Sequence, residues 1–122
     1  MKVAGFGFRA AATVASLRDA LEQAGGLGDL EALAVASDRT DADCVNDLAK
    51  ALGLRVLAVS EDAVRAVSTL TQSKVAQRAR GAGSLAEAVA LVGAGPDASL
   101  CAPRVFSADR LAACAIAEGS SS

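Results

Sequence analysis

Apolar residues along the chain fall into runs that follow a strand pattern and a helix pattern in turn. Residues 2–8 form a short apolar run, and apolar side chains then recur at helical spacing from 14 to 24, where a Gly-Gly pair follows. A second run at 30–37 leads into a helical segment over 40–53, and a third run occupies 54–60. This repeated strand-then-helix order predicts βαβ units.

The second half of the chain departs from this regular order. Ser60 and two acidic residues predict a short helix that ends near residue 68, and residues 69–83 are polar, basic and rich in glycine. A segment of this length without an apolar pattern of its own is typical of a binding loop. A helix over 84–92, stopped by glycines, follows, and a Ser-Ala-Asp-Arg turn between the last two apolar runs predicts a C-terminal hairpin.

These elements predict an α/β fold of three layers, in which helices cover both faces of a mostly parallel sheet that ends in the hairpin. We expect residues 1–118 to form a single domain, because a chain of 122 residues can bury a core without disulfides or metal. Residues 119–122 are expected to form a disordered tail. In this architecture ligands bind beyond the carboxyl ends of the strands, so the loops there are the expected binding site.

The composition narrows the chemistry that this protein can perform. Hydrophobic residues make up 52% of the chain but aromatic residues only 2%, and histidine is absent. Because histidine is the commonest general base and metal ligand, an enzyme is the less favoured class, and we expect no cofactor and no bound metal. Cys44, Cys101 and Cys114 match neither a disulfide framework nor a zinc pattern, which predicts buried thiols in a reducing compartment. No signal peptide or membrane span is indicated, so we expect a cytoplasmic protein.

Charge is distributed unevenly along the chain, whose net charge is −2. Residues 1–62 carry 6 basic and 10 acidic side chains, whereas residues 63–122 carry 6 basic and 4 acidic ones. Three of the basic residues, Lys74, Arg78 and Arg80, precede a glycine turn, and this cluster indicates either an anion site or a solvated basic face. A nucleic-acid partner is disfavoured because the chain is acidic overall and lacks aromatic stacking residues.

The strongest local motif is the segment GAGSLAEAVAL at 81–91. Ser84 and Glu87 have the spacing of a capping box, in which each side chain accepts a hydrogen bond from the backbone amide of the other. The remaining amides of this helix start, together with the helix dipole, favour a negatively charged ligand. We therefore predict that Gly83 and Ser84 contribute to an anion site.

A second glycine-rich segment, VAGFGFRAAAT, places Gly5, Gly7 and Arg9 between the first apolar run and a helix that opens near Thr13. We interpret this segment as a second anion-binding turn, and two such turns predict a polyanionic ligand. Two alternatives stay open. The glycines resemble the dinucleotide fingerprint, with Asp38 as the ribose-binding acid, although the chain lacks the second half of such a domain. The glycines can also serve only to form turns.

Several motifs, found in one order along the chain, carry a specific resemblance. They are VAGFGFRAAAT near the N-terminus, ALAVASDRTDAD after the second apolar run begins, the region from Ser73 to Leu91, and APRVFSAD near the C-terminus. On these residues the chain resembles the cobalamin-biosynthesis family of CobE and the C-terminal domain of CbiG, over nearly its whole length. The resemblance implies a three-layer α/β fold and a role in making the corrin ring of vitamin B12.

A corrin or precorrin intermediate is a flat apolar disc with acetate and propionate carboxylates at its rim, so it needs several anion-binding groups around one cleft. Glycine turns and serines would bind some carboxylates, and Arg39 and Arg104 would close the rim by bidentate pairing. The candidate ligand-binding residues are Gly5, Gly7, Arg9, Thr13, Ser37, Arg39, Ser73, Lys74, Gly83, Ser84 and Arg104. Where CbiG domains often read Asp-Leu-Lys-x-Asp-Glu, this chain reads Ser-Asp-Arg-Thr-Asp-Ala at 37–42, and Arg104 replaces a lysine after the late proline.

The residues and the resemblance together predict a cobalamin biosynthesis protein that binds or hands on a corrin or precorrin intermediate without chemistry of its own. An alternative is an enzyme that hydrolyses or rearranges the precorrin macrocycle, as the lactone-opening CbiG hydrolases do, with Glu87 or Asp41 as acid or base. A third alternative is an interaction module for other enzymes of the cobalamin pathway.

Overall fold

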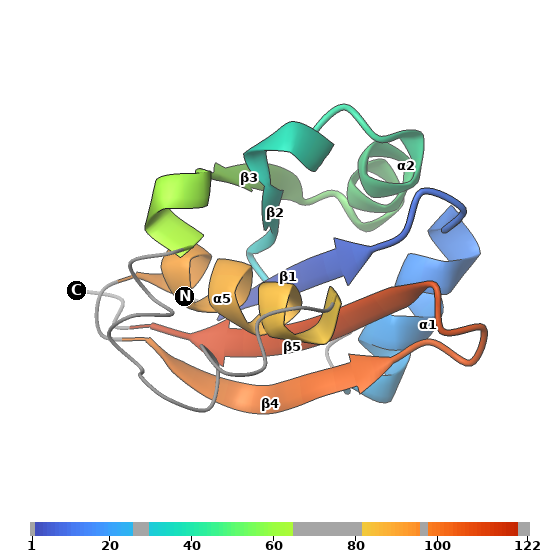
Figure 1. Ribbon diagram of the computed structural model, residues 1–122. Coiled ribbons are helices and arrows are strands. Elements are labelled where there is room, and N and C mark those ends of the chain that lie inside the picture. The colour runs from blue at the N-terminus through green and yellow to red at the C-terminus, as the bar shows by residue number, and fades with distance from the viewer. Residues whose placement is uncertain (1, 26–29, 65–81, 96–97, 120–122) are drawn as a thin grey trace.

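The computed structural model describes residues 2–25, 30–64, 82–95 and 98–119. A five-stranded sheet forms its middle layer, and helices cover both faces of that sheet (Figure 1). The strands are β1 (Lys2–Phe8), β2 (Ala32–Ala36), β3 (Arg55–Val59), β4 (Ser99–Phe106) and β5 (Ala112–Glu118). The helices are α1 (Val14–Gln23), α2 (Asp43–Leu52), α5 (Ala82–Ala94) and the short 3-10 helix η1 (Ser37–Arg39), and residues 61–64 are also helical. This arrangement confirms the predicted three-layer α/β class.

The strands follow the order β3-β2-β1-β5-β4 across the sheet. β1, β2 and β3 pair in parallel, and β5 lies antiparallel between β1 and β4. β1, β2, β3 and β4 therefore run in one direction and β5 runs in the opposite one. β4 and β5 form the predicted C-terminal hairpin.

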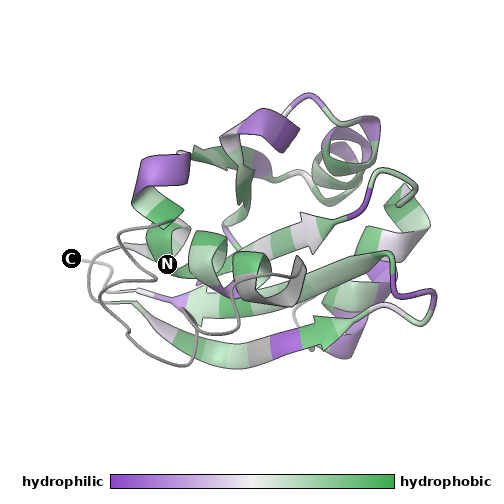
Figure 2. Ribbon diagram, in the orientation of Figure 1, coloured by the Kyte–Doolittle hydropathy of each residue, from purple (hydrophilic) through white to green (hydrophobic). Residues whose placement is uncertain are grey.

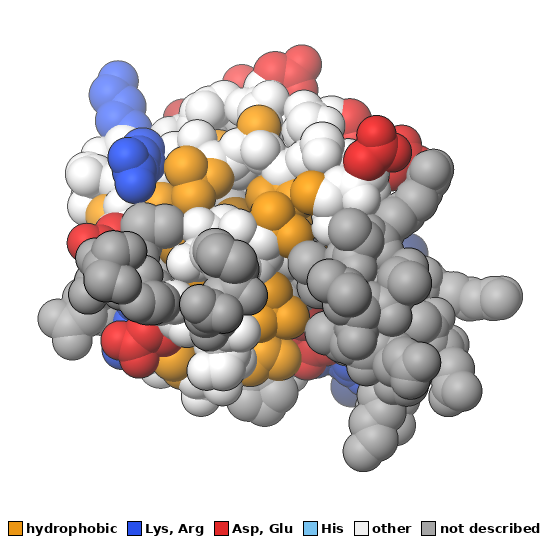
Figure 3. Space-filling model, turned by 90° about the vertical axis from the view of Figure 1, so that its left-hand side faces the viewer, with side chains coloured by type: hydrophobic (Ala, Val, Ile, Leu, Met, Phe, Trp, Pro, Cys, Tyr) orange, Lys and Arg blue, Asp and Glu red, His pale blue; other side chains and the backbone are white. Residues whose placement is uncertain are grey.

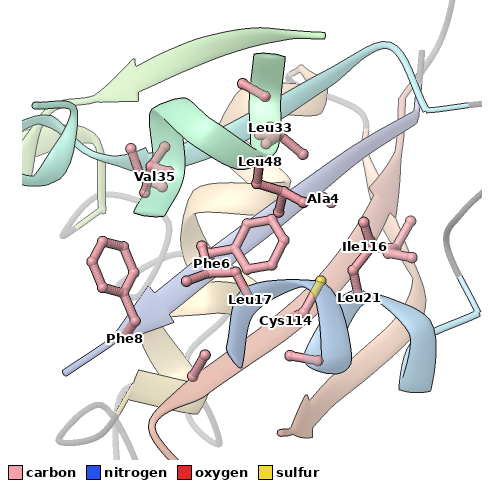
Figure 4. Packing of buried hydrophobic residues seen from close by; sticks show 14 residues of the cluster. Ala4, Phe6, Phe8, Leu17, Leu21, Leu33, Val35, Leu48, Cys114 and Ile116 are labelled. Atoms are coloured by element: carbon pink, nitrogen blue, oxygen red, sulfur yellow. The ribbon is translucent and has the colours of Figure 1, made fainter. Parts of the chain in front are cut away.

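One face of the sheet carries the larger apolar cluster, under α1 and α2. Side chains alternate between the two faces along β1, and Phe6 and Phe8 lie on the α1 and α2 side (Figure 4). Phe6 shares this cluster with Leu17 of α1, Leu48 of α2 and Cys114 of β5, all of which are buried. The apolar positions that helical spacing predicts in α1 and α2 thus face the sheet.

The other face of the sheet is lined by small side chains and is covered by α5. Gly5 lies in the middle of β1, where a Cβ atom would stand 2.3 Å from the carbonyl oxygen of Ala86 and 2.5 Å from the amide nitrogen of Ala90. The backbone of α5 therefore occupies the space that a side chain at this position would need. Gly7 lies on the same face of β1. Gly5 and Gly7 do not form the predicted turn, because both are strand residues paired with β5.

α5 begins earlier and ends later than the sequence predicts. It already includes Ala82, so Ser84 lies inside the helix and not at its N-cap, and it continues through Gly93. Gly93 therefore does not stop the helix. Its missing side chain instead lets α5 approach the sheet closely. A Cβ atom at this position would lie 3.1 Å from the side chains of Val3 and Ala34.

The glycines predicted to end the first two helices do so. Gly25 follows α1 and Gly53 follows α2, with φ angles of 76° and 68° that a side chain rarely adopts. The helical segment predicted over 40–53 begins later than expected, because α2 begins at Asp43 and its N-cap is Ala42, which makes no side-chain hydrogen bond.

α5 is the most apolar of the three described α-helices that have a label. In Figure 2 α5 carries apolar colours along most of its length, and residues 86–90 are all buried. Half-buried apolar residues, among them Leu57 of β3, Val64 and Val92 of α5 itself, pack against the same cluster. Figure 3, which faces the side where β1 begins and β5 ends, shows apolar side chains that reach the surface between charged ones. Within the described ranges, no helix combines the length and the apolar character that crossing a membrane requires.

Candidate functional site

Arg9 and Arg39 lie at the carboxyl ends of two adjacent parallel strands. Arg9 follows β1 directly and is exposed, and Arg39 lies in η1, just beyond β2. The Arg39 guanidinium carbon stands 5.2 Å from the ring centroid of Phe8, the last residue of β1. This cation–π contact turns Arg39 toward the end of β1, where Arg9 begins the next loop. The structure thus places two of the predicted rim residues at the carboxyl ends of neighbouring strands.

α5 brings Gly83 and Ser84 to the same end of β1. The middle of α5 covers Gly5, and Gly93 near its end lies beside Val3, so α5 runs antiparallel to β1 (Figure 1). Its first turn therefore lies toward the carboxyl end of β1. α1 starts at that end as well, but it packs on the opposite face of the sheet. The two predicted anion sites share an end of the sheet without sharing a face.

The N-terminus of α1 is capped by hydrogen bonds between side chains and backbone of the protein itself. Thr13 is the N-cap: its hydroxyl accepts the amide of Ser16 at 3.3 Å, and the Ser16 hydroxyl accepts the amide of Thr13 at 3.2 Å. The Ser16 hydroxyl also donates to a carboxylate oxygen of Asp109, 2.6 Å away, in the turn between β4 and β5. The negative charge that the sequence predicts at this helix start is thus supplied by the chain itself.

Asp109 holds the β4–β5 turn in place. The hydroxyl of Ser107, the hydroxyl of Ser16 and the amide of Leu111 all donate to its carboxylate, and together they hold the pKa of Asp109 below its usual value. Beside it, the amide of Ala108 donates to the carboxylate of Asp19 in α1 at 2.6 Å. The hairpin is therefore tied to α1 at two points.

Glu87 binds β4 and not the start of its own helix. The residue is buried, with 7% of its surface exposed. One carboxylate oxygen accepts the main-chain amide of Arg104 at 3.2 Å, and the other lies 3.5 Å from a terminal nitrogen of the Arg104 guanidinium. The predicted capping box is wrong, because Ser84 is already helical and the Glu87 carboxylate serves another element. A buried carboxylate needs such a partner, since an unpaired buried charge is strongly destabilising.

Of the other candidate residues, Ser37 and Asp41 are exposed to solvent. Ser37 opens η1 and is exposed, and its carbonyl oxygen accepts the hydroxyl of Thr40 at 3.2 Å. Asp41, the candidate acid or base before α2, is exposed. Ser73 and Lys74, together with the rest of the predicted binding loop up to residue 81, lie outside the described residues.

The three cysteines differ in exposure. Cys114 is buried in β5, Cys44 is half-buried in the first turn of α2, and Cys101 is exposed on β4. Burial raises the pKa of Cys44, and the backbone amides of the helix start and the charge of Arg39 partly offset this effect. The prediction of buried thiols is therefore wrong for Cys101, which lies on an edge strand. In the described part of the chain, no group of three or more His, Cys, Asp or Glu residues is placed to hold a metal ion.

Sequence reasoning misses Ser16, Asp109 and Phe8. The Thr-x-x-Ser spacing at 13–16 is a weaker form of a capping box and is the one local signal for Ser16. No local pattern marks Asp109 as its partner, because the two residues are 93 positions apart. Phe8 reads as a core residue, and its contact with Arg39 depends on how β2 lies beside β1.

The fold and the site define a small α/β protein that carries arginines at the carboxyl ends of adjacent central strands. Over residues 2–117 the sequence matches the family described as cobalamin synthesis G C-terminus. The chain belongs to this family. The resemblance that the sequence motifs carry is thereby confirmed.

Solved structures of cobalamin biosynthesis proteins share the fold. The crystal structure of cobalamin biosynthesis protein chiG from Agrobacterium tumefaciens is similar with a TM-score of 0.74 and 31% identity, covering 98% of this chain and 99% of that one. CobE, a protein from the cobalamin (vitamin B12) biosynthetic pathway, is similar with a TM-score of 0.76 and 31% identity, covering 96% of this chain and 89% of that one. A cobalamin biosynthesis protein G homolog from Sulfolobus solfataricus shows the same fold at 15% identity, with a TM-score of 0.72 over 98% of this chain and 37% of that one. A search of curated protein sequences found no match.

Proposed function

We propose that this protein binds a corrin or precorrin intermediate of cobalamin biosynthesis in the cytoplasm and hands it on to other enzymes of the pathway. Membership of the family supports the pathway, and the two similar structures at 31% identity are cobalamin biosynthesis proteins. The observation that carries the ligand class is the placement of Arg9 directly after β1 and of Arg39 just beyond β2, where Arg39 contacts the ring of Phe8 at the end of β1.

The chemistry of a corrin intermediate fits this placement. Its rim carries several carboxylates, and a guanidinium binds a carboxylate through two parallel hydrogen bonds. Ligands of α/β sheets bind beyond the carboxyl ends of the strands, which is where Arg9 and Arg39 lie. Arg104 on β4 is a third guanidinium, and 28% of its side chain is exposed.

The remaining polar candidates divide into two groups. Gly83 and Ser84 in the first turn of α5 are proposed to bind a carboxylate through free amides of the helix start. Ser37, Ser73 and Lys74 are proposed as further rim contacts. We leave out Gly5, Gly7 and Thr13, because the fold itself uses the two glycines in β1 and the threonine in the cap of α1.

Calorimetric titration with cobyrinic acid, together with its visible spectrum, tests this proposal. We expect a Kd of about 10 μM or tighter for the wild-type protein. Arg9→Gln and Arg39→Gln should each weaken binding about tenfold, because each removes a charge-assisted hydrogen bond. Arg18→Gln, at an exposed position of α1, is the matched control and should leave the Kd unchanged. No binding at about 1 mM cobyrinic acid would refute the proposal.

A hydrolase that acts on the macrocycle is the alternative, and a turnover assay separates it from a binding protein. Of the two candidate acids, Glu87 is buried against Arg104 and Asp41 is exposed. We expect a lactone-bearing cobalt-precorrin to remain unchanged when incubated with the protein and analysed by mass spectrometry. Loss of the lactone, abolished by Asp41→Asn with the affinity unchanged, would establish the hydrolase instead.

A further inference from the structure

We propose that Glu87 is a positioning residue that aims the Arg104 guanidinium at a carboxylate of the bound ligand. This inference rests on the proposed function, because it assigns one arginine of that site a fixed direction. The two residues come from different elements, the buried helix α5 and the edge strand β4.

The first supporting observation is a break in the β4–β5 ladder at Arg104. β4 advances three residues from Ala102 to Val105 while β5 advances two, so one extra residue falls at Pro103–Arg104. Bulges of this kind occur at sheet edges and beside active sites, where they redirect a side chain. The main-chain amide of Arg104 donates to Glu87 within this break. The Glu87 carboxylate therefore fixes the backbone at the position where β4 leaves its regular register.

The second observation is that one carboxylate holds two groups of the same residue. Its oxygens lie 3.2 Å from the main-chain nitrogen of Arg104 and 3.5 Å from a terminal nitrogen of the guanidinium. An arginine presents five N–H donors in a planar fork, and the ion pair with Glu87 involves one of its two terminal nitrogens. Since 28% of the Arg104 side chain is exposed, donors remain accessible to a ligand carboxylate.

Stability alone is a weak reason for a carboxylate at this place. The neighbours of Glu87 along α5 are Ala86 and Ala88, both buried. Buried ion pairs lose much of their attraction to desolvation, and apolar pairs of similar volume are often at least as stable. The direction that Glu87 imposes on Arg104 explains the pair better than any gain in stability.

The charge of Glu87 and its geometry act on ligand binding in opposite directions. A negative charge beside Arg104 repels a ligand carboxylate, so removing the charge alone would tighten binding. Without the contact to Glu87, the Arg104 guanidinium is ordered only when the ligand binds. The entropy lost in that ordering weakens ligand binding. The sign of the change in affinity therefore distinguishes a positioning residue from a mere counter-charge.

The experiment compares cobyrinic acid with the derivative in which every side-chain carboxylate is an amide, titrated into wild-type and variant proteins. Glu87→Gln keeps the side-chain size and loses the charge, and Glu87→Asp keeps the charge and shortens the reach. We expect both to weaken cobyrinic acid binding about fivefold and to leave binding of the amide unchanged. Glu22→Gln, an exposed acid of α1, is the control and should alter neither affinity.

A double variant shows whether Glu87 acts through Arg104. Arg104→Gln should weaken cobyrinic acid binding about tenfold, and Glu87→Gln added to it should have no further effect, because the two share one interaction. Unchanged or tighter binding by the Glu87 variants that remain folded, or an equal loss for acid and amide, would overturn the positioning role. A wild-type protein that binds neither probe would instead refute the proposed function, so the two failures are distinct.

Discussion

The hydroxyl of Ser16 in α1 donates a 2.6 Å hydrogen bond to the carboxylate of Asp109 in the β4–β5 turn, across 93 positions of sequence. The same hydroxyl accepts the amide of Thr13 and so completes the cap of α1. Ser16 is 2% exposed whereas Asp109 is exposed, so the bond runs from the core to the surface of the protein. One buried serine thus joins the first helix to the last hairpin.

Ser16→Ala is expected to weaken both the cap and this link. The substitution removes one donor and one acceptor, and we expect the free energy of unfolding to fall by about 1–2 kcal/mol in urea denaturation. Ser99→Ala, at an exposed position of β4, is the control and should change the stability by less than about 0.5 kcal/mol. If Ser16→Ala is as stable as the wild type, the contact does not contribute to the fold.

Asp109 should make part of the stability depend on acid pH. Its hydrogen bonds, led by the one from Ser107, place its pKa in the folded state below the value of 3.8 expected for the unfolded chain. A depressed folded-state pKa gives stability that is complete above the unfolded value and is lost as the pH falls through the folded value.

The variant Asp109→Asn lacks this ionisable group. The difference in stability between wild type and variant should be constant near neutral pH and should shrink below about pH 4. Urea unfolding at a series of pH values measures that difference. A difference that grows on acidification would contradict the assigned direction.

Gly5→Ala tests the close approach of α5 to β1. The new methyl group would stand 2.3 Å from a backbone oxygen of Ala86, so α5 would have to move. Overpacking costs about 1–3 kcal/mol, and we expect the upper end of this range in urea denaturation. Gly25→Ala is the matched control: its Cβ meets nothing within 4 Å, and its φ of 76° predicts a loss of about 1 kcal/mol. Equal losses at the two positions would argue against the tight packing.

Thiol reactivity should follow the exposure of the three cysteines. With an aromatic disulfide reagent and single-cysteine variants, Cys101 should react first, Cys44 more slowly, and Cys114 only after unfolding. Because burial raises the pKa of Cys44, its reaction should accelerate as the pH rises from about 7 to about 9. Rapid reaction of Cys114 in the native protein would be inconsistent with its position in β5.

The elements of the fold follow from the sequence where local periodicity decides them. The apolar run at 2–8 forms β1. The last two apolar runs form β4 and β5, and the turn residues between them connect the two strands into a hairpin. Gly5 shows the limit of such reasoning. Its spacing from Gly7 and Arg9 indicates a binding turn, yet the need for glycine arises from α5, which is encoded in the other half of the chain.

The candidate site shows the same limit at the level of side chains. Arg9 and Arg39 could be predicted from residue type and from their places after strands, but the contact of Arg39 with Phe8 depends on how the strands lie together. The spacing of Ser84 and Glu87 is typical of a helix cap. In the structure the Glu87 carboxylate instead accepts the main-chain amide of Arg104, which lies at the bulge in β4. Such partners are set by tertiary structure and leave no local pattern.

The most direct test of the central claim is a crystal structure of the protein soaked with cobyrinic acid. We expect the corrin at the carboxyl ends of β1 and β2, with rim carboxylates within about 3 Å of guanidinium nitrogens of Arg9 and Arg39. A corrin bound on another side of the molecule, or crystals that hold none at about 1 mM, would contradict the account.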